Sequence, residues 1–393
     1  MKIGIDARMF GPETGIGRYT ENLIRNLELV DRKNEYVIFL SPEKFSAYVP
    51  AAKNFTRVIA KSRWYSFREQ IEMPRLINQA KVNLMHFSHF NVPLLCSAPF
   101  VVSIHDLILL DFPTARATTM GPLFYWLKYK IAYPLVIRNA VSRAKTIITM
   151  AKYTKERIVE VFKINPEKIK IIYEGVADSV RQTAYDTPPK KITKSFLLCV
   201  GNAYPHKNLE GLVDAFLDLK NPSPTLPLGK GEGLSSPFAK GDRGGFDYQL
   251  VLVGKEDYFY RRLKDYIKFK NDPNTADIIL YGFAPDAELA VLYKKAALYV
   301  FPSFMEGFGL PPLEAMAHGL PVVSSNASCL SEILGNAALY FDPKNSVEML
   351  SAMKRGLTDE SLRAELRERG FRQIKTYSWR QCAEETLEVY NFV

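Results

Sequence analysis

The sequence predicts an α/β protein built from two Rossmann-like domains, each a parallel sheet covered by helices. Its 393 residues are too many for one compact core and suit two domains. Short apolar runs alternate with helical patterns in the first half, which is typical of a doubly wound parallel sheet. The same alternation starts again near residue 196.

Strands are predicted in the first half at the apolar runs 2–6, 35–40, 83–87, 100–105 and 146–150. A helix over 18–30 follows the first strand, because Leu23, Ile24 and Leu27 recur on one face at helical spacing.

The second half predicts strands at 196–200, 250–253, 278–281, 298–302 and 321–324. We expect Asn208 to cap the helix that follows the first of these strands. A helix that begins at Pro311-Pro312 is expected to end near Gly319, because proline is tolerated at a helix start and glycine favours a helix end.

We predict an N-terminal domain over 1–185, a C-terminal domain over 186–378 and a last helix within 379–393 that packs back on the first domain. The linker is expected within 174–192. Residues 221–245 contain 13 Gly, Pro or Ser in 25 and stand where about 2–6 residues usually connect a helix to a strand. We interpret them as a flexible surface insertion.

The composition, 47% hydrophobic and 24% charged, excludes collagen-like, disordered and coiled-coil chains. The four cysteines match no metal-ligand spacing, and we expect them to be reduced and buried. No signal peptide is predicted, since the chain runs from Met1 directly into the first strand. No apolar run is long enough to span a membrane. These features predict a cytoplasmic protein.

The net charge of +10 is unevenly distributed. Residues 1–190 contain 28 Lys and Arg against 17 Asp and Glu, whereas residues 191–393 contain 24 against 25. A one-sided basic domain favours an anionic partner such as a phosphate or an anionic membrane surface. A solvated basic surface is an equal alternative. No nucleic-acid-binding module is recognised, so no nucleic-acid partner is expected.

The stretch FPSFMEGFGLPPLEAMAHGLP, residues 301–321, is the most informative. Gly307 and Gly309 let backbone amides approach a ligand closely, and a helix start offers unpaired N–H groups to phosphate or sugar oxygens. Glu306 in the loop and Glu314, expected in the first helical turn, are eight residues apart and suit the two ends of one hydroxyl-rich ligand. The alternative is that Glu314 only complements the helix dipole.

Three further elements follow predicted strands. Lys207 stands one residue before the expected helix cap, where its ammonium and the helix start can meet one anion. Gly15, in the turn Thr14–Arg18, suits a close approach to phosphate but completes no dinucleotide fingerprint. His105 lies at a strand end, the edge that faces ligands in open α/β sheets, although a lone histidine is more often structural. No motif indicates a tightly held metal, so no cofactor is expected.

Together these stretches resemble the family 4 retaining glycosyltransferases of GT-B architecture, whose active site lies in the cleft between two domains. The resemblance covers nearly the whole chain and is carried by residues 6–23, 103–107, 171–176, 200–208, 281–293 and 306–323. The two glutamates with their flanks are its most specific part. Within the family the chain looks most like GDP-mannose-dependent mannosyltransferases of bacterial surface polysaccharide synthesis.

The resemblance implies a role for each matching residue. Glu306 would hold the hydroxyls of the donor sugar, Glu314 the ribose, and Lys207 the diphosphate. His105 would contact the donor sugar near the reacting carbon. The remaining donor-binding residues would be Gly15, Asn202, Gly282, Phe283, Gly307, Phe308, Gly309 and Leu310. Asn202 departs from the family, because many members carry an arginine there.

The implied reaction transfers a sugar from a nucleoside diphosphate to a hydroxyl of a glycan or of a lipid-diphosphate-linked acceptor, with retention of configuration. A UDP-sugar donor, a sugar-nucleotide epimerase, a nicotinamide oxidoreductase and a non-catalytic nucleotide-sugar-binding subunit are the alternatives. Aromatic and basic residues in 120–143 fit a helix at the inner face of the cell membrane, and a buried aromatic helix is the equal alternative.

Overall fold

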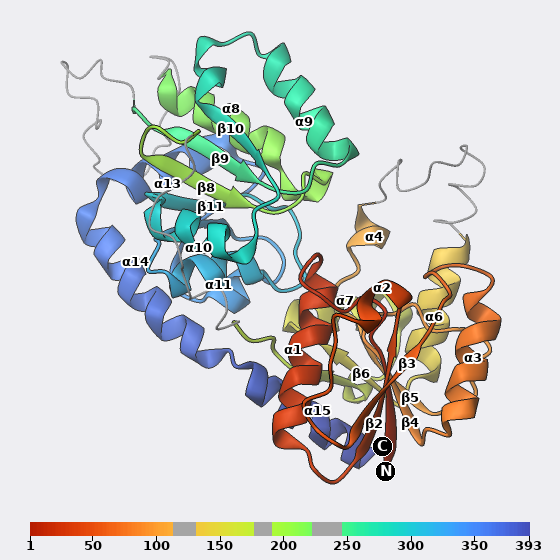
Figure 1. Ribbon diagram of the computed structural model, residues 1–393. Coiled ribbons are helices and arrows are strands. Elements are labelled where there is room, and N and C mark those ends of the chain that lie inside the picture. Colours follow the sequence, from red (N-terminus) through yellow and green to blue (C-terminus); the bar gives the residue numbers. More distant parts are fainter. Residues whose placement is uncertain (113–130, 177–190, 222–245) are drawn as a thin grey trace. The chain divides into compact units, whose positions relative to one another are not determined.

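The computed structural model describes residues 1–112, 131–176, 191–221 and 246–393 (Figure 1). These residues form two compact units, Met1–Gly175 with Tyr377–Val393, and Val176–Thr376. Most of the expected linker, nearly all of the expected insertion and residues 113–130 lie outside the described residues, and so does the predicted domain boundary at 185/186. The two units are therefore described one at a time.

The first unit is built on a seven-stranded sheet in the order β3-β2-β1-β4-β5-β6-β7, with every strand pair parallel. Its central strands are continuous apolar runs because both faces of a parallel sheet are covered by helices. The strands are β1 Lys2–Asp6, β2 Glu35–Leu40, β3 Phe55–Ile59, β4 Leu84–Phe87, β5 Phe100–Ser103, β6 Thr146–Thr149 and β7 Ile169–Ile171.

Helices of the first unit cover this sheet, and one core contains residues of α3, α6 and the strands. The last helix, α15 (Trp379–Phe392), packs against α1 (Gly15–Val30). In α15, Tyr390 forms a hydrogen bond of 2.5 Å with Nδ1 of His86 on β4. The other helices are α2 Pro42–Phe45, α3 Glu69–Ala80, α4 Ile108–Asp111, α6 Tyr133–Arg143 and α7 Lys152–Phe162.

The second unit has a six-stranded parallel sheet in the order β10-β9-β8-β11-β12-β13. Its strands are β8 Phe196–Val200, β9 Gln249–Val253, β10 Ile278–Gly282, β11 Leu298–Phe301, β12 Val322–Ser325 and β13 Ala338–Phe341. Its helices are α8 Leu209–Lys220, α9 Tyr258–Phe269, α10 Asp286–Lys295, α11 Leu310–Ala317, α12 Leu330–Leu334, α13 Ser346–Thr358 and α14 Glu360–Gln373. A core forms where α8, α9 and α13 pack on the sheet.

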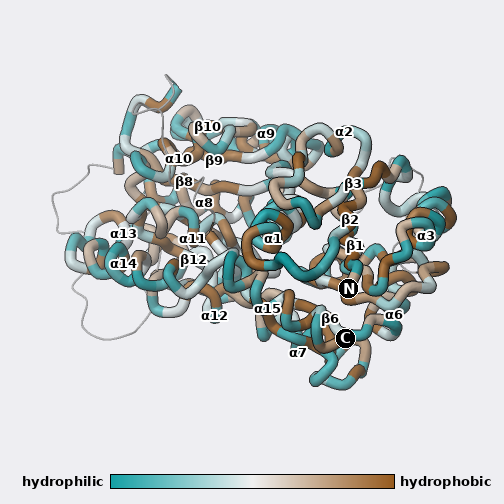
Figure 2. Tube along the Cα trace, turned by 60° about the horizontal axis from the view of Figure 1, so that its bottom comes forward, coloured by the Kyte–Doolittle hydropathy of each residue, from teal (hydrophilic) through white to brown (hydrophobic). Residues whose placement is uncertain are grey.

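In both sheets the strand order reverses direction beside the first strand, at β1/β4 and at β8/β11. Ligands of open α/β sheets bind at such a switch point, outside the carboxyl ends of the strands. The fold thus marks one candidate edge in each unit. Figure 2 shows that the strands run through hydrophobic segments while hydrophilic residues lie along the helices that cover them.

The two-sheet α/β prediction is confirmed, with differences at the sheet edges. Strands β3, β7 and β13, which the sequence analysis did not predict, are all edge strands. The four cysteines are buried and free, as expected. Within the described part of the chain, no helix has the length and apolar character needed to cross a bilayer.

Candidate functional site

An ion pair between Lys207 and Glu306 stands at the switch point of the second unit. The Lys207 ammonium donates to both carboxylate oxygens of Glu306, at 2.7 and 2.8 Å. The two residues follow the adjacent strands β8 and β11, and their side chains are only 16% and 9% exposed. A desolvated cation and a carboxylate therefore meet where a ligand is expected.

The backbone fixes the position of Lys207. Residues Pro205–Lys207 form a 3-10 turn between β8 and α8. The amide of Phe304 donates to the carbonyl of His206 at 2.7 Å, which ties this turn to the loop after β11. The Lys207 ammonium also lies 5.6 Å from the centre of the Phe301 ring.

Asn208 corrects one expectation. It occupies the cap position of α8, but in a left-handed conformation with φ of 55° and with no capping hydrogen bond from its side chain. Its amide nitrogen donates instead to the carbonyls of Pro302 and Pro343, at 3.2 and 3.1 Å. The side chain thus joins three loops rather than closing the helix.

The loop after β11 is held from the side by Ser328 and Cys329. The amide of Glu306 donates to the Ser328 hydroxyl at 2.9 Å. The Cys329 thiol lies 3.3 Å from the carbonyl of Glu306 and 3.5 Å from that of Phe308, which is itself buried. These contacts use the Glu306 amide and two carbonyl groups of the loop, so they hold the loop without engaging the amide groups that begin α11.

Helix α11 begins at Leu310, and Gly309 before it has a φ of +100°, a conformation that favours glycine. Gly307 lies between Glu306 and Phe308 in the same loop. The start of α11 carries unpaired N–H groups and partial positive charge.

Glu314 lies in the second turn of α11, not in the first turn that the sequence analysis expected. It is buried, and the Tyr293 hydroxyl donates to its Oε2 at 3.0 Å. At this depth the carboxylate does not serve to complement the helix dipole at the first turn.

Polar atoms without partners line the ends of β8 and β11. Oδ1 of Asn202 and Oγ of Ser303 are both buried and have no hydrogen-bond partner among the described residues. Buried polar groups are normally paired, so unpaired ones at a strand edge indicate a place for a polar ligand. At the end of β10, which is separated from β8 by β9, Gly282 has a φ of +86°, and the Phe283 side chain is 64% exposed.

In the first unit Gly15 begins α1, so the predicted glycine turn is the first turn of the helix. Thr14 caps it by accepting from the amide of Gly17 at 3.0 Å. A Cβ added to Gly15 would meet no atom within 4 Å in the part of the chain that the structure describes. Arg18 donates to the carbonyl of Pro12 at 3.2 Å.

His105 lies two residues after the end of β5 and is 9% exposed. Its Nδ1 is 3.2 Å from Oε1 of Glu174, and its Nε2 is 3.0 Å from the carbonyl oxygen of Ser88. Its ring stands nearly perpendicular to the Tyr19 ring, at an interplanar angle of 84° and with centroids 4.7 Å apart. His86, by contrast, is a core residue paired with Tyr390 and Ser103, and burial lowers its pKa to about 3.

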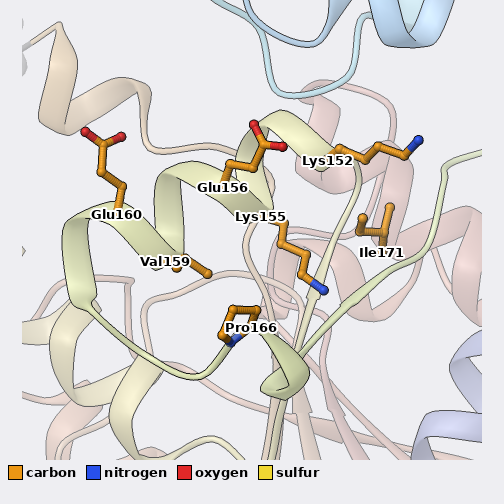
Figure 3. A pocket seen from close by; sticks show the side chains of 7 residues that line it. All are labelled: Lys152, Lys155, Glu156, Val159, Glu160, Pro166 and Ile171. Atoms are coloured by element: carbon orange, nitrogen blue, oxygen red, sulfur yellow. The ribbon is translucent and has the colours of Figure 1, made fainter.

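An open hollow of about 520 Å³ lies beside α7, and Figure 3 shows the residues that line it. Lys155 extends toward Pro166 and donates to the carbonyl of Ile169 at 3.0 Å. None of the candidate site residues named in the sequence analysis lines the hollow. No group of three or more His, Cys, Asp or Glu residues suited to a metal ion occurs in the described ranges.

The structure thus brings Lys207 and Glu306 into contact, places Asn202 and the start of α11 at the same sheet edge, and assigns Gly15 and His105 to the other unit. Sequence reasoning missed the residues that contact the predicted site residues. Glu174 contacts His105, Tyr293 contacts Glu314, and Ser328 and Cys329 contact Glu306. Glu174 lies within a stretch that carried the resemblance, and its place after an apolar strand was the available signal.

Two family models match the chain over adjacent ranges. Residues 14–180 match "Glycosyltransferase Family 4", and residues 181–373 match "Glycosyl transferases group 1".

Named relatives match over much of the chain. O-antigen chain mannosyltransferase B of Escherichia coli is 29% identical, and the match covers 97% of each chain. O-antigen chain mannosyltransferase RfbU of Salmonella typhimurium is 27% identical over 74% of this chain and 69% of its own.

A solved structure of Anabaena Alr3699/HepE in complex with UDP-glucose superimposes with a TM-score of 0.70 at 16% identity, covering the whole of both chains.

Proposed function

The chain belongs to the glycosyltransferases, with GT-B architecture, and from this premise we propose that it moves a mannosyl group from GDP-mannose to a hydroxyl acceptor. The acceptor is a glycan or a lipid-diphosphate-linked sugar of cell-surface polysaccharide synthesis. The observation that carries the proposal is the Lys207–Glu306 pair at the switch point of the second unit, beside the start of α11.

The donor site that we propose uses the features of this edge. A donor diphosphate would take the Lys207 ammonium as its counter-charge, which frees the Glu306 carboxylate to accept from the sugar hydroxyls. The amides of Phe308, Gly309 and Leu310 suit the sugar and phosphate oxygens, because they stand at a helix start. Oδ1 of Asn202 offers a buried acceptor, and Glu314 offers a carboxylate for the ribose.

The mannosyl assignment rests on the relatives' names, since two of them are O-antigen mannosyltransferases. A UDP-sugar donor is the second candidate, because the Anabaena structure of the same fold contains UDP-glucose. No side chain described above distinguishes guanine from uracil, so the nucleotide screen below decides which base the donor carries.

Chemically, the bond between the sugar carbon and the diphosphate oxygen breaks while the acceptor oxygen bonds to the same face of that carbon. The acceptor proton passes to the departing phosphate. Negative charge grows on the phosphate in the transition state, so a pre-placed ammonium lowers the barrier there. In this scheme Lys207 supplies that charge, and addition of EDTA should leave the rate unchanged.

An exposed basic and aromatic segment of the first unit suits an anionic membrane. Trp64, Tyr65, Phe67 and Ile71 are exposed, Phe67 at 95%, and Arg63 is exposed beside them. Aromatic rings inserted among headgroups next to cationic side chains are the usual means of interfacial binding. In segment 120–143, for which the sequence analysis held a membrane helix and a buried helix as equal alternatives, residues 120–130 lie outside the described residues and Tyr133 belongs to the core.

Flotation with phosphatidylglycerol-containing vesicles tests this attachment. The protein should float at low salt and be released as salt screens the charges. Phe67→Glu should weaken flotation, whereas Phe269→Glu, at a side chain 86% exposed in the second unit, should not. Absence of binding at low salt would refute the membrane partner.

A melting-temperature screen with GDP, UDP, ADP, GDP-mannose and UDP-glucose tests the donor site. A ligand at about 100 times its dissociation constant adds about 2.7 kcal/mol of stability. A shift with GDP and GDP-mannose alone supports the proposal. A shift with UDP and UDP-glucose would instead identify a UDP-sugar as the donor. If no nucleotide shifts the melting temperature, the proposed donor site is refuted.

A further inference from the structure

The His105 ring faces a hydrogen-bond acceptor at each nitrogen. Its Nε2 is 3.0 Å from the Ser88 carbonyl oxygen, which can only accept, so Nε2 carries a proton. Its Nδ1 is 3.2 Å from a carboxylate oxygen of Glu174. A neutral imidazole has one N–H, so one proton more must lie between Nδ1 and Glu174.

That proton belongs on the histidine. An imidazole is a stronger base than a carboxylate, which favours the imidazolium–carboxylate pair over the neutral pair. Burial alone would lower the pKa of His105. The hydrogen bond and charge of Glu174, the Ser88 carbonyl and the charge of Asp106 outweigh burial and raise it above its usual value.

The other titratable groups around the pair do not compete for the proton. Burial lowers the pKa of His86 and His89 to about 3, so both rings are neutral at pH 7. Burial raises the pKa of the Tyr19 phenol and the Cys382 thiol, which interact with the Glu174 charge, so both keep their protons. Glu174 is therefore the negative charge in contact with the ring.

We propose that Glu174 is a positioning residue, one that keeps His105 doubly protonated with both N–H groups fixed. The effect of this arrangement on sugar transfer rests on the proposed function, whereas the protonation state of His105 does not. A doubly protonated ring has no lone pair at neutral pH, so His105 does not take the acceptor proton. It serves as a fixed cation of defined orientation at the strand edge of the first unit.

Nuclear magnetic resonance of ¹⁵N-histidine-labelled protein tests the protonation state without any substrate. The chain has five histidines, and His105→Gln identifies the signal by its loss. Wild-type His105 should show both nitrogens protonated at pH 7. In Glu174→Gln, whose amide can still donate to Nδ1, the pKa should fall by about 1–3 units, because an opposite charge in contact is removed.

Transfer assays across pH test the consequence. Glu174→Gln should lose activity near pH 7.5 and regain part of it as the pH falls through the lowered pKa of His105. A merely structural role would give no such rescue by acid. Glu174→Asp, which keeps the charge, should retain more activity than Glu174→Gln at pH 7.5. Glu167→Gln, at an exposed site, should change neither readout.

Each outcome decides a separate point. A neutral His105 ring in the wild-type protein at pH 7 overturns the inference, even where the Gln variant fails to fold. An unchanged pH profile in a folded Glu174→Gln variant overturns the positioning role. If the wild-type protein transfers no sugar from any donor, the proposed function fails, and the role in transfer fails with it whatever the resonance shows.

Discussion

Lys207 shows how a residue that looks solvated in a sequence acquires a specific environment in the fold. A lysine before a helix is usually exposed, but here its ammonium is held by both oxygens of Glu306, 99 residues away in the chain. Long-range pairing of this kind depends on which two strands are neighbours, and β8 and β11 become neighbours only in the assembled sheet.

The first prediction concerns the rate. Lys207→Ala should lower kcat by about 10² to 10³, the usual cost of removing one pre-placed electrostatic donor. Lys264→Ala, at an exposed site on α9, is the matched control and should keep the wild-type rate. Steady-state kinetics measure kcat, and circular dichroism shows whether each variant is folded. A folded Lys207→Ala variant with a near-normal rate would remove Lys207 from the mechanism.

The second prediction concerns stability. Lys207→Ala leaves the Glu306 carboxylate buried without its cation, and breaking a buried pair typically costs about 3–5 kcal/mol. The double substitution Lys207→Ala, Glu306→Ala removes both charges and should recover part of that loss. Denaturant unfolding of the two single variants and the double variant measures the coupling. Additive losses would mean that the pair contributes no interaction energy to the fold.

At the scale of elements, the sequence was informative where apolar runs are continuous and less so where they are short. The central strands were predicted to within two residues at each end. Strands β3 and β7 were missed because a polar residue interrupts each short run, as Arg57 does in Phe55–Ile59 and Lys170 in Ile169–Ile171. Strand β13 was missed although its run is apolar, and β10, which is also an edge strand, was predicted.

The same limit applies to the site. Lys207, Glu306 and Glu314 were selected from local motifs, and the structure places them at or beside one sheet edge. Their supports were not predictable from local patterns. Ser328 reaches the site from a loop and Tyr293 from α10. Tyr293 ends a stretch that carried the resemblance, but nothing in the sequence pairs either residue with the site.

The start of α1 gives the third prediction. A methyl group at Gly15 meets no atom of the described residues within 4 Å, and alanine is the better helix former by about 1 kcal/mol in a helix interior. Gly15→Ala should therefore leave the melting temperature unchanged or raised. If a donor phosphate approaches this backbone, the same variant should raise KM for the donor. An unchanged KM would remove Gly15 from the donor-binding residues that the resemblance implies.

The junction before α15 gives the fourth prediction. A Cβ on Gly175 would lie 2.2 Å from the backbone nitrogen of Trp379, too close to be relieved by a side-chain movement. Gly175→Ala should lower the free energy of unfolding by about 1–3 kcal/mol, as overpacking does. Thermal unfolding measures the change, with Gly15→Ala as the matched glycine. Equal melting temperatures for the two variants would contradict the contact.

At the scale of the whole molecule, buried histidines predict how stability depends on pH. Burial lowers the pKa of His86 to about 3 and that of His206 to about 4. Between these values and about 6.5 the unfolded chain binds more protons than the folded one. The contribution of these two histidines to the free energy of unfolding is therefore complete above pH 6.5 and is lost as the pH falls toward 3–4.

Thermal unfolding between pH 7.5 and 4.5 checks this fifth prediction. The melting temperature should fall with the pH, and His206→Gln should make the fall shallower. The raised pKa of His105 works in the opposite direction, since its contribution is present below pH 6.5 and lost as pH rises through the folded-state value. A melting temperature that rises on acidification would mean that His105 outweighs the other histidines.

The chain leaves the first unit after Gly175 and returns to it at Tyr377, so the second unit is one uninterrupted insert in the first. This arrangement sets an order during synthesis. Residues 1–175 emerge from the ribosome before the second unit, but α15, which covers α1, emerges after it. The second unit is the one that can fold as a continuous segment while translation proceeds. The first unit is thus begun before the second and completed after it. Until α15 is made, the face of α1 that α15 covers and the His86 ring lack the contacts that this helix provides.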